Sequence, residues 1–481
     1  MPRSNQEAAS LFAKNALECN SEKIRESRLF RVDPTMTTIA EPRSVKAPGP
    51  RRTIGFVTAC SIVIANIIGT GIFTSLGFQL PEIHSGFGLL MLWVVGGITA
   101  LCGALCYGEL SASLPRSGGE YHFLSKIYHP ALGFMAGFVS ATVGFAAPIA
   151  LAAMAFGKYF RGVFDFGSPV VLSFVLVWVV ALFHFGNLRL GSAFQNLWTI
   201  VKLFLIGVLI GAGFLVEQKQ PITFLPRPGD TMSVFSGAFA VALVYVMYSY
   251  SGWNASTYII GEVKEPERNV PRSLFAGTIV VIAVYVLLNA VFLMTTPMQE
   301  MRGRIEVGLI AGKHIFGADG GRIVGALICL GLVSTISSMT WIGPRVTMSM
   351  GEDHWLLRLL GQKNSQGVPT NAMIVQLLIV TLLLLTRSFE SVVQYTQFSL
   401  LICSLLAVVG VIVLRFTQPA LPRPYRVWGY PLPPLVFATV TIWMMIYLLR
   451  SHTTESLAGL ATMLVGFALY FCAGKRLRRS A

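Results

Sequence analysis

The residues best suited to binding a small solute lie in two apolar stretches of the chain. The first stretch reads "NIIGTGIF" (66–73), and Gly69, Thr70 and Gly71 form its centre. Glycine disfavours a helix by about 1 kcal/mol relative to alanine. Irregular backbone at membrane depth survives only where it is buried in protein or lines a cavity. Taken alone, the triplet fits either a close helix–helix contact or a helix break that exposes backbone to a ligand.

The second stretch, "AVALVYVMYSYSGWNASTYII", favours the break. Small and polar residues gather at its middle: Ser249, Ser251, Gly252 and Asn254. Interrupted segments at corresponding places in two halves of a chain indicate a transporter's binding site. A broken helix offers free N–H groups at one end and free C=O groups at the other. The N–H groups around Gly71 suit a carboxylate, and the carbonyls near Ile67 and Ser249 suit an ammonium. The pair therefore fits a zwitterion such as an α-amino acid.

A lysine deep in another apolar stretch is the third candidate. Lys202, in "LWTIVKLFLIG", lies about 13 residues beyond Arg189, which is roughly 20 Å along a helix. A charge near the membrane centre costs about 2.5–3.5 kcal/mol on insertion scales, so it is treated as functional. The alternatives are a structural lysine bonded to backbone carbonyls and a proton-coupling group.

The elements that must carry these residues are membrane-spanning helices. Of the 481 residues, 54% are hydrophobic and only 12% are charged, and the apolar runs have the length that spans a bilayer. The sequence predicts an all-α integral membrane protein in contact with the lipid bilayer. The expected spans number about twelve, at 54–82, 88–113, 131–157, 169–186, 190–216, 234–262, 273–296, 321–350, 370–386, 390–415, 431–450 and 456–473.

The basic residues orient these spans. Most of the 37 lysines and arginines fall in the two terminal segments and in the loops on the same side, so both termini are expected in the cytoplasm of a cell-membrane protein. The same bias explains the net charge of +15 without nucleic acid. The predicted parts are a mobile tail (1–52), two five-span repeats (53–216 and 217–415) and a final pair of spans with a basic C-terminus (416–481).

Three motifs in order resemble a known family. They are "NIIGTGIF", "YGELSASLPRSGGEYHFL" (107–124) and "YSGWNASTYIIGEVKEPERNVPRSL" (250–274). Together they resemble the amino acid–polyamine–organocation superfamily, most closely its L-type amino acid transporter branch, over about residues 52–475. The resemblance implies a LeuT-like 5+5 inverted-repeat fold with broken helices 1 and 6.

The resemblance also implies roles for individual residues. The amides that hold the substrate carboxylate are those of Ile68, Gly69, Thr70 and Gly71. The carbonyls that hold the α-amino group are those of Ile67, Tyr248, Ser249 and Ser251. Tyr248 is the aromatic residue that closes over the substrate, and Gly252 and Asn254 belong to the family's "GWN" segment. Lys202 takes the place of a sodium ion and bridges the first break to span eight, where its candidate partners are Thr335 and Ser338.

Two acidic residues and the cysteines complete the predictions. Glu109 is either a gate or the partner of a loop arginine, and Glu262 is either a gate or a partner of Arg272, Arg116 or Arg345. The loop "GKYFRGVFDFGSP" after span three lacks the cysteine through which eukaryotic L-type relatives join a heavy chain, so no disulfide-linked heavy chain is expected. The spacing of the seven cysteines indicates neither a zinc site nor a disulfide framework.

The sequence therefore predicts a sodium-independent secondary transporter of L-amino acids, preferably neutral ones, working as an exchanger or a proton-coupled symporter. No cofactor or metal is predicted, and the chain lacks the motifs of an enzyme. A transport-deficient amino acid sensor is one alternative, and a cationic amino acid or polyamine transporter of the same fold is another.

Overall fold

The computed structural model describes residues 52–477 apart from 187, 355–356 and 365–366. The predicted tail, 1–52, therefore lies almost wholly outside the described residues. The helices are α2 (Phe56–Ile67), α3 (Gly71–Gln79), α4 (Gly86–Ser113), α5 (Gly119–Ile127), α6 (Pro130–Val139), η1 (Ser140–Gly144), α7 (Ala146–Phe164), α8 (Pro169–Gly186), α9 (Leu188–Leu215), α10 (Asp230–Ser233), α11 (Gly237–Tyr250), η2 (Ala255–Glu262), α12 (Pro266–Thr295), α13 (Met298–Met301), α14 (Val307–Asp353), α15 (Thr370–Leu385), α16 (Phe389–Thr417), α17 (Leu432–Ser451) and α18 (Thr453–Leu477).

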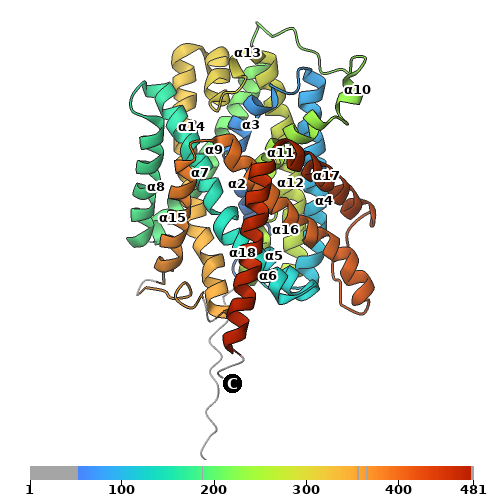
Figure 1. Cartoon of the computed structure of the whole chain (residues 1–481). Helices are drawn as coiled ribbons and strands as arrows, with labels where there is room; N and C mark the ends of the chain where they lie inside the picture. Colours follow the sequence, from blue (N-terminus) through green and yellow to red (C-terminus); the bar gives the residue numbers. More distant parts are fainter. Residues whose placement is uncertain (1–51, 187, 355–356, 365–366, 478–481) are drawn as a thin grey trace, which may run out of the picture. The chain divides into compact units, whose positions relative to one another are not determined.

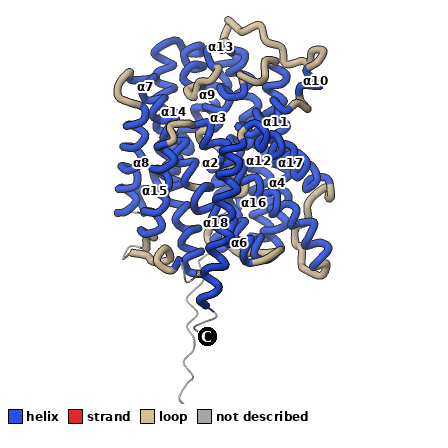
Figure 2. Tube along the Cα trace, viewed as in Figure 1, coloured by secondary structure: helices blue, strands red, loops and turns tan. Residues whose placement is uncertain are grey.

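The described part of the chain is helical throughout. Figure 2 shows helices joined by loops, and the single β contact in this part is an isolated bridge between Ile54 and Val263. Within the described ranges, nine helical segments are long and apolar enough to cross a membrane, and Pro169–Phe185 and Thr370–Leu385 are shorter apolar helices. An all-helical, multi-pass membrane protein is therefore confirmed, while the count of twelve spans and the inverted repeat remain predictions.

Local sequence explains where several of these helices begin. Ser85, Ser236 and Ser388 each precede a helix, and their hydroxyl oxygens accept a hydrogen bond from a backbone N–H in its first turn. Such N-caps satisfy donors that the helix itself leaves free. Proline at the first helical position begins α12, because its fixed φ suits a helix start and its missing N–H is not needed there.

Both predicted helix breaks are present. The first helix stops at Ile67 and resumes as α3 at Gly71. The second stops at Tyr250 and resumes at Ala255 as the 3₁₀ helix η2, after a turn in which Gly252 has φ +101°. In Figure 1, α2 and α3 follow one another through the middle of the view, and α11 packs beside α3.

Burial separates inner helices from outer ones. The most apolar stretch of α4 is 61% buried inside the protein, and that of Pro130–Phe164 is 67% buried. The corresponding stretch of Thr453–Cys472 is only 22% buried. The outer helices expose large apolar side chains: Leu182, Phe183 and Leu464 are 67%, 74% and 67% exposed. Exposed apolar surface on this scale fits contact with lipid rather than water.

Candidate functional site

A cavity of about 150 Å³ lies between the two helix breaks. Its walls come from both breaks, from the start of α5, from the π-helical segment η1 and the start of α7, and from α14 and α16. The predicted substrate-binding residues that line it are Ile67, Gly69, Thr70, Gly71, Tyr248, Ser249, Ser251, Gly252 and Asn254. The two breaks, whose residues are 181 positions apart from Gly71 to Gly252, therefore meet around one small space.

Two glycines allow the broken helices to approach each other this closely. A Cβ added to Gly71 would lie 2.5 Å from Ser249 Oγ and 2.6 Å from Ser249 Cα. A Cβ added to Gly252 would lie 2.9 Å from Asn66 O, and the φ of +101° there is one that L side chains rarely adopt. Gly69 is different, because its nearest contact would be an ordinary 3.8 Å to Thr335 Cγ2.

The N–H groups of the first break are divided between two uses. Ile68 N donates to Ile64 O at 2.9 Å, and Gly69 N donates to Ile67 O at 2.8 Å. The N–H groups of Thr70 and Gly71 donate no hydrogen bond to any described residue. They stand at the N-terminal end of α3, where the helix itself offers no carbonyl to accept from them. The predicted use of the Ile68 and Gly69 amides is therefore corrected: helix capping and a tight turn occupy them.

The carbonyls of the two breaks share a tyrosine that the sequence reasoning missed. Tyr285 of α12 has its hydroxyl 2.7 Å from Ile67 O and 3.1 Å from Ser249 O. A carbonyl oxygen has two lone pairs. Ile67 O already accepts from both Tyr285 and Gly69 N, whereas Ser249 O, which accepts from Tyr285, retains a lone pair for an ammonium. Tyr285 stands in an apolar run, "VIAVYVLLNAVF", where a mid-span tyrosine is the one signal that could have found it.

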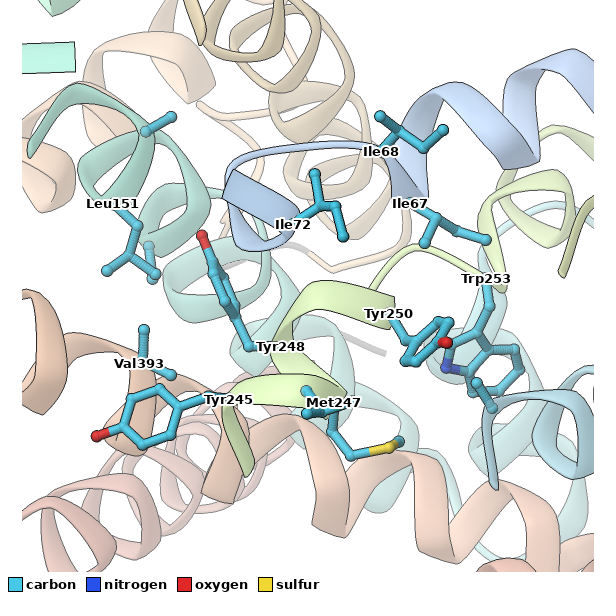
Figure 3. Packing of buried hydrophobic residues seen from close by; sticks show 14 of the residues in the cluster. Ile67, Ile68, Ile72, Leu151, Tyr245, Met247, Tyr248, Tyr250, Trp253 and Val393 are labelled. Atoms are coloured by element: carbon cyan, nitrogen blue, oxygen red, sulfur yellow. The ribbon is translucent and has the colours of Figure 1, made fainter. Parts of the chain in front are cut away.

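Tyr248 lies among other aromatic side chains at one side of the cavity. Its ring centre is 6.3 Å from that of Phe389, and Phe389 stacks on Phe78 at 5.4 Å. Phe78 in turn stacks on Tyr245, also at 5.4 Å. Figure 3 shows the Tyr248 ring directed toward the start of α3, where Ile72 lies. Of these four rings only Tyr248 belongs to the described cavity lining, so Tyr248 is the ring that can cover a ligand there, with the other three packed behind it.

Lys202 reaches the first break from α9. Its Nζ donates to Ile68 O at 3.1 Å and to Thr335 Oγ1 at 3.4 Å, so it links α9, the first break and α14. The stem packs against Gly331, where an added Cβ would lie 3.0 Å from Lys202 Cγ. Ser338 lines the same small polar cavity, of about 10 Å³, as Lys202 and Thr335. The lysine is 5% exposed, and its partners are oxygen atoms of the kind that coordinate a cation.

The two predicted gate residues lie outside the cavity lining of the described chain. Glu109 forms ion pairs with Arg415 and Arg423, the latter at 3.6 Å, and accepts from Val427 N at 2.7 Å. These contacts fit the second predicted role of Glu109, as the partner of a loop arginine, and not that of a gate. Glu262 makes no ion pair within 4.0 Å among the described residues, and its carbonyl accepts from Thr53 N and Ile54 N. Its candidate partner Arg116 pairs with Asp353 instead, at 3.4 Å.

The structure adds a carboxylate that the sequence reasoning did not use. Glu120 begins α5, lines the cavity and is 5% exposed. Its oxygens accept hydrogen bonds from Tyr107, Asn254 and Tyr258 at 2.8, 2.7 and 2.6 Å. The motif "SGGEY" (117–121) is the only sequence signal at this position. Sequence reasoning missed Glu120 because a glutamate so close to a loop is usually exposed to water.

Comparison with known proteins finds one family model and several relatives that match almost the whole described chain. Residues 54–469 match the model of a family described as amino acid permease. The chain is 27% identical to the mouse large neutral amino acids transporter small subunit 2, over 88% of this chain and 81% of that protein. It is 25% identical to the human b(0,+)-type amino acid transporter 1, over 90% and 91%. It is 26% identical to the mouse Asc-type amino acid transporter 1, over 88% and 81%.

Proposed function

The chain belongs to the amino acid permease family, and from that premise we propose that it carries neutral L-amino acids across the membrane by alternating access, without sodium. The relatives are named as amino acid transporters, so the predicted resemblance and the prediction that the chain is no enzyme are confirmed. The substrate class, the coupling and the site residues are the parts proposed here.

The observation that carries the proposal is the pair of unlike helix ends around one cavity. The N–H groups of Thr70 and Gly71 have no other acceptor in the described chain and stand at the positive end of α3. Ile67 and Ser249 line the same cavity, and the Ser249 carbonyl can accept a hydrogen bond beyond the one from Tyr285. A carboxylate bound to the N–H groups of Thr70 and Gly71 and an ammonium bound to the Ser249 carbonyl would satisfy both helix ends. Every α-amino acid carries these two groups.

Sodium independence is proposed from Lys202. Its ammonium bonds to the Ile68 carbonyl and the Thr335 hydroxyl, which are oxygen ligands suited to a small cation. A fixed ammonium at this place would supply the positive charge and the link between α2 and α14 that a bound sodium ion could otherwise provide. An exchanger and a proton-coupled symporter are both consistent with that arrangement.

We also propose that the chain works without a disulfide-linked heavy chain and with both termini in the cytoplasm. One of the mouse relatives is named a small subunit, which implies a larger partner for that protein. Here residues 157–169, which form the last part of α7, the loop at 165–168 and the first residue of α8, include no cysteine.

The proposal is tested by flux in proteoliposomes. Vesicles with or without internal unlabelled amino acid receive labelled leucine, threonine, arginine or glutamate, with sodium, without sodium, and with an inward proton gradient. We expect neutral amino acids to be taken up at the same rate with and without sodium. A strict sodium requirement would contradict the role of Lys202. Ligand-dependent thermal stabilisation without any flux would indicate a sensor instead.

A further inference from the structure

Glu120 is a buried carboxylate in the cavity wall without a cationic partner. Among the described residues, it forms no ion pair within 4.0 Å. Two tyrosine hydroxyls and one amide donate to it: Tyr107 and Asn254 to Oε1, and Tyr258 to Oε2. Three such donors stabilise an ionised carboxylate in place of water. Three neutral side chains therefore hold the Glu120 carboxylate in one fixed position in the cavity wall.

The chain leading into Glu120 is shaped for this contact. Gly118 and Gly119 have φ values of +131° and +53°, so both occupy backbone conformations that suit glycine. A Cβ added to Gly119 would lie 2.4 Å from Tyr258 Cε1. The glycine pair therefore lets α5 begin directly against the Tyr258 ring and brings the carboxylate to the second helix break.

This carboxylate fixes which way the Asn254 amide faces. An ionised carboxylate can only accept hydrogen bonds, so the Asn254 NH₂ group must face it. The amide nitrogen lies 2.7 Å from Glu120 Oε1 and 3.3 Å from the Tyr258 hydroxyl, which gives both of its hydrogens an acceptor. A flipped amide would set two acceptors against each other at hydrogen-bond distance. The network thus determines the orientation.

The consequence is a hydrogen-bond acceptor at the cavity. Asn254 lines the cavity, and within the described residues its Oδ1 accepts no hydrogen bond. Other polar side chains in the same lining are Ser140, Gln397 and Ser404. An acceptor left without a donor is costly once a ligand has excluded water. A donor on the ligand would remove that cost.

We propose that Glu120 is a positioning residue that presents Asn254 Oδ1 to the substrate side chain, and that the cavity therefore prefers neutral amino acids whose side chain donates a hydrogen bond. This inference rests on the proposed transport function and names its substrate class. A site built around a hydrogen bond discriminates against an isostere that lacks the donor. Threonine and valine are such a pair, since they differ by one hydroxyl in nearly the same shape.

The test compares threonine and valine as competitors of labelled amino acid uptake in proteoliposomes of the full chain. Wild type should be inhibited by threonine at a concentration about 3- to 10-fold lower than by valine, as one neutral hydrogen bond implies. In E120Q the new amide can donate to Asn254 and release its orientation, so the ratio should fall to about one. E120D keeps two accepting oxygens and should restore much of the preference. Each ratio is measured within one variant, so differences in expression cancel.

Glu390 provides a matched control. It also accepts from a tyrosine hydroxyl, Tyr245 at 2.8 Å, and from an amide, Gln394 at 3.2 Å, but it is absent from the described cavity lining. E390Q should keep the wild-type ratio. If E120Q fails to fold, Y258F serves in its place, because it removes one donor to Glu120 and the acceptor of the second Asn254 N–H. Its ratio should fall part of the way.

Several results would overturn the proposal. Equal inhibition of wild type by threonine and valine would do so, as would wild-type ratios in both E120Q and Y258F. Stronger inhibition by lysine than by threonine would mean that the carboxylate meets a substrate cation directly. Uptake with unchanged ratios contradicts only the role of Glu120, whereas wild-type protein that takes up no amino acid contradicts the proposed function as well.

Discussion

The two helix breaks face the same cavity but are built in different ways. The first is short and is held by backbone and a charge: Gly71 gives room, and Lys202 binds the Ile68 carbonyl. The second is longer and is held by side chains, since it turns at Gly252 and its Asn254 is bonded to Glu120. The first thus presents groups that suit what all amino acids share, and the second presents groups that can distinguish side chains.

The largest effect is expected from closing the space between the breaks. Gly71→Ala would set a methyl group 2.5 Å from Ser249 Oγ and 2.6 Å from Ser249 Cα, and backbone cannot move away without separating the helices. Overpacking of this kind costs about 1–3 kcal/mol. We expect a lower melting temperature of the purified protein and uptake reduced to background.

Gly69→Ala is the matched comparison for stability. Its nearest contact would be 3.8 Å, an ordinary separation, so the melting temperature should stay close to that of wild type. Equal melting temperatures for the two variants would show that the breaks do not pack as described.

The next effect tests whether the first break depends on its charge. Lys202→Met keeps the length of the side chain but removes the bond to the Ile68 carbonyl, and hydrogen bonds from charged groups contribute about 1.5–3 kcal/mol. Uptake should fall about 10- to 100-fold, while the threonine-to-valine ratio stays unchanged.

Lys313→Met removes an exposed lysine and serves as the control. If Lys202→Met takes up amino acids at the wild-type rate, with and without sodium, the proposed role of Lys202 in place of a sodium ion is wrong. A changed threonine-to-valine ratio would instead show that the two breaks are not separate in function.

The smallest effect concerns the contact that joins the breaks. Tyr285→Phe removes the hydroxyl placed between Ile67 O and Ser249 O, a neutral hydrogen bond of about 0.5–1.5 kcal/mol. Uptake should fall about 3- to 10-fold. Tyr250→Phe is the control, because that hydroxyl is equally buried but bonds to Trp93 O of α4 and not to a carbonyl of either break. Equal losses in the two variants would contradict a special role for Tyr285.

The same comparison explains what could be predicted from the sequence. The first break was predictable because Gly69, Thr70 and Gly71 interrupt an apolar run, and glycine weakens a helix through its own backbone. Lys202 was conspicuous because a lone charge in an apolar run is rare. These signals are local, so a single chain displays them.

The side-chain network of the second break could not be predicted in this way. Glu120 and Asn254 are 134 positions apart, and their contact depends on the turn at Gly118 and Gly119 as well as on the packing of Tyr258. The division of the first-break amides also escaped prediction. It depends on the turn in which Gly69 N donates to Ile67 O, and composition does not specify that turn.

The division of roles between the breaks is tested most directly by competition with threonine, threonine methyl ester and valine in wild-type proteoliposomes. The ester lacks the negative charge that the N–H groups of Thr70 and Gly71 would bind, so it should compete about 100-fold more weakly than threonine. Valine should compete only about 3- to 10-fold more weakly. Competition by the ester as strong as that by threonine would contradict carboxylate binding at the first break, on which the account depends.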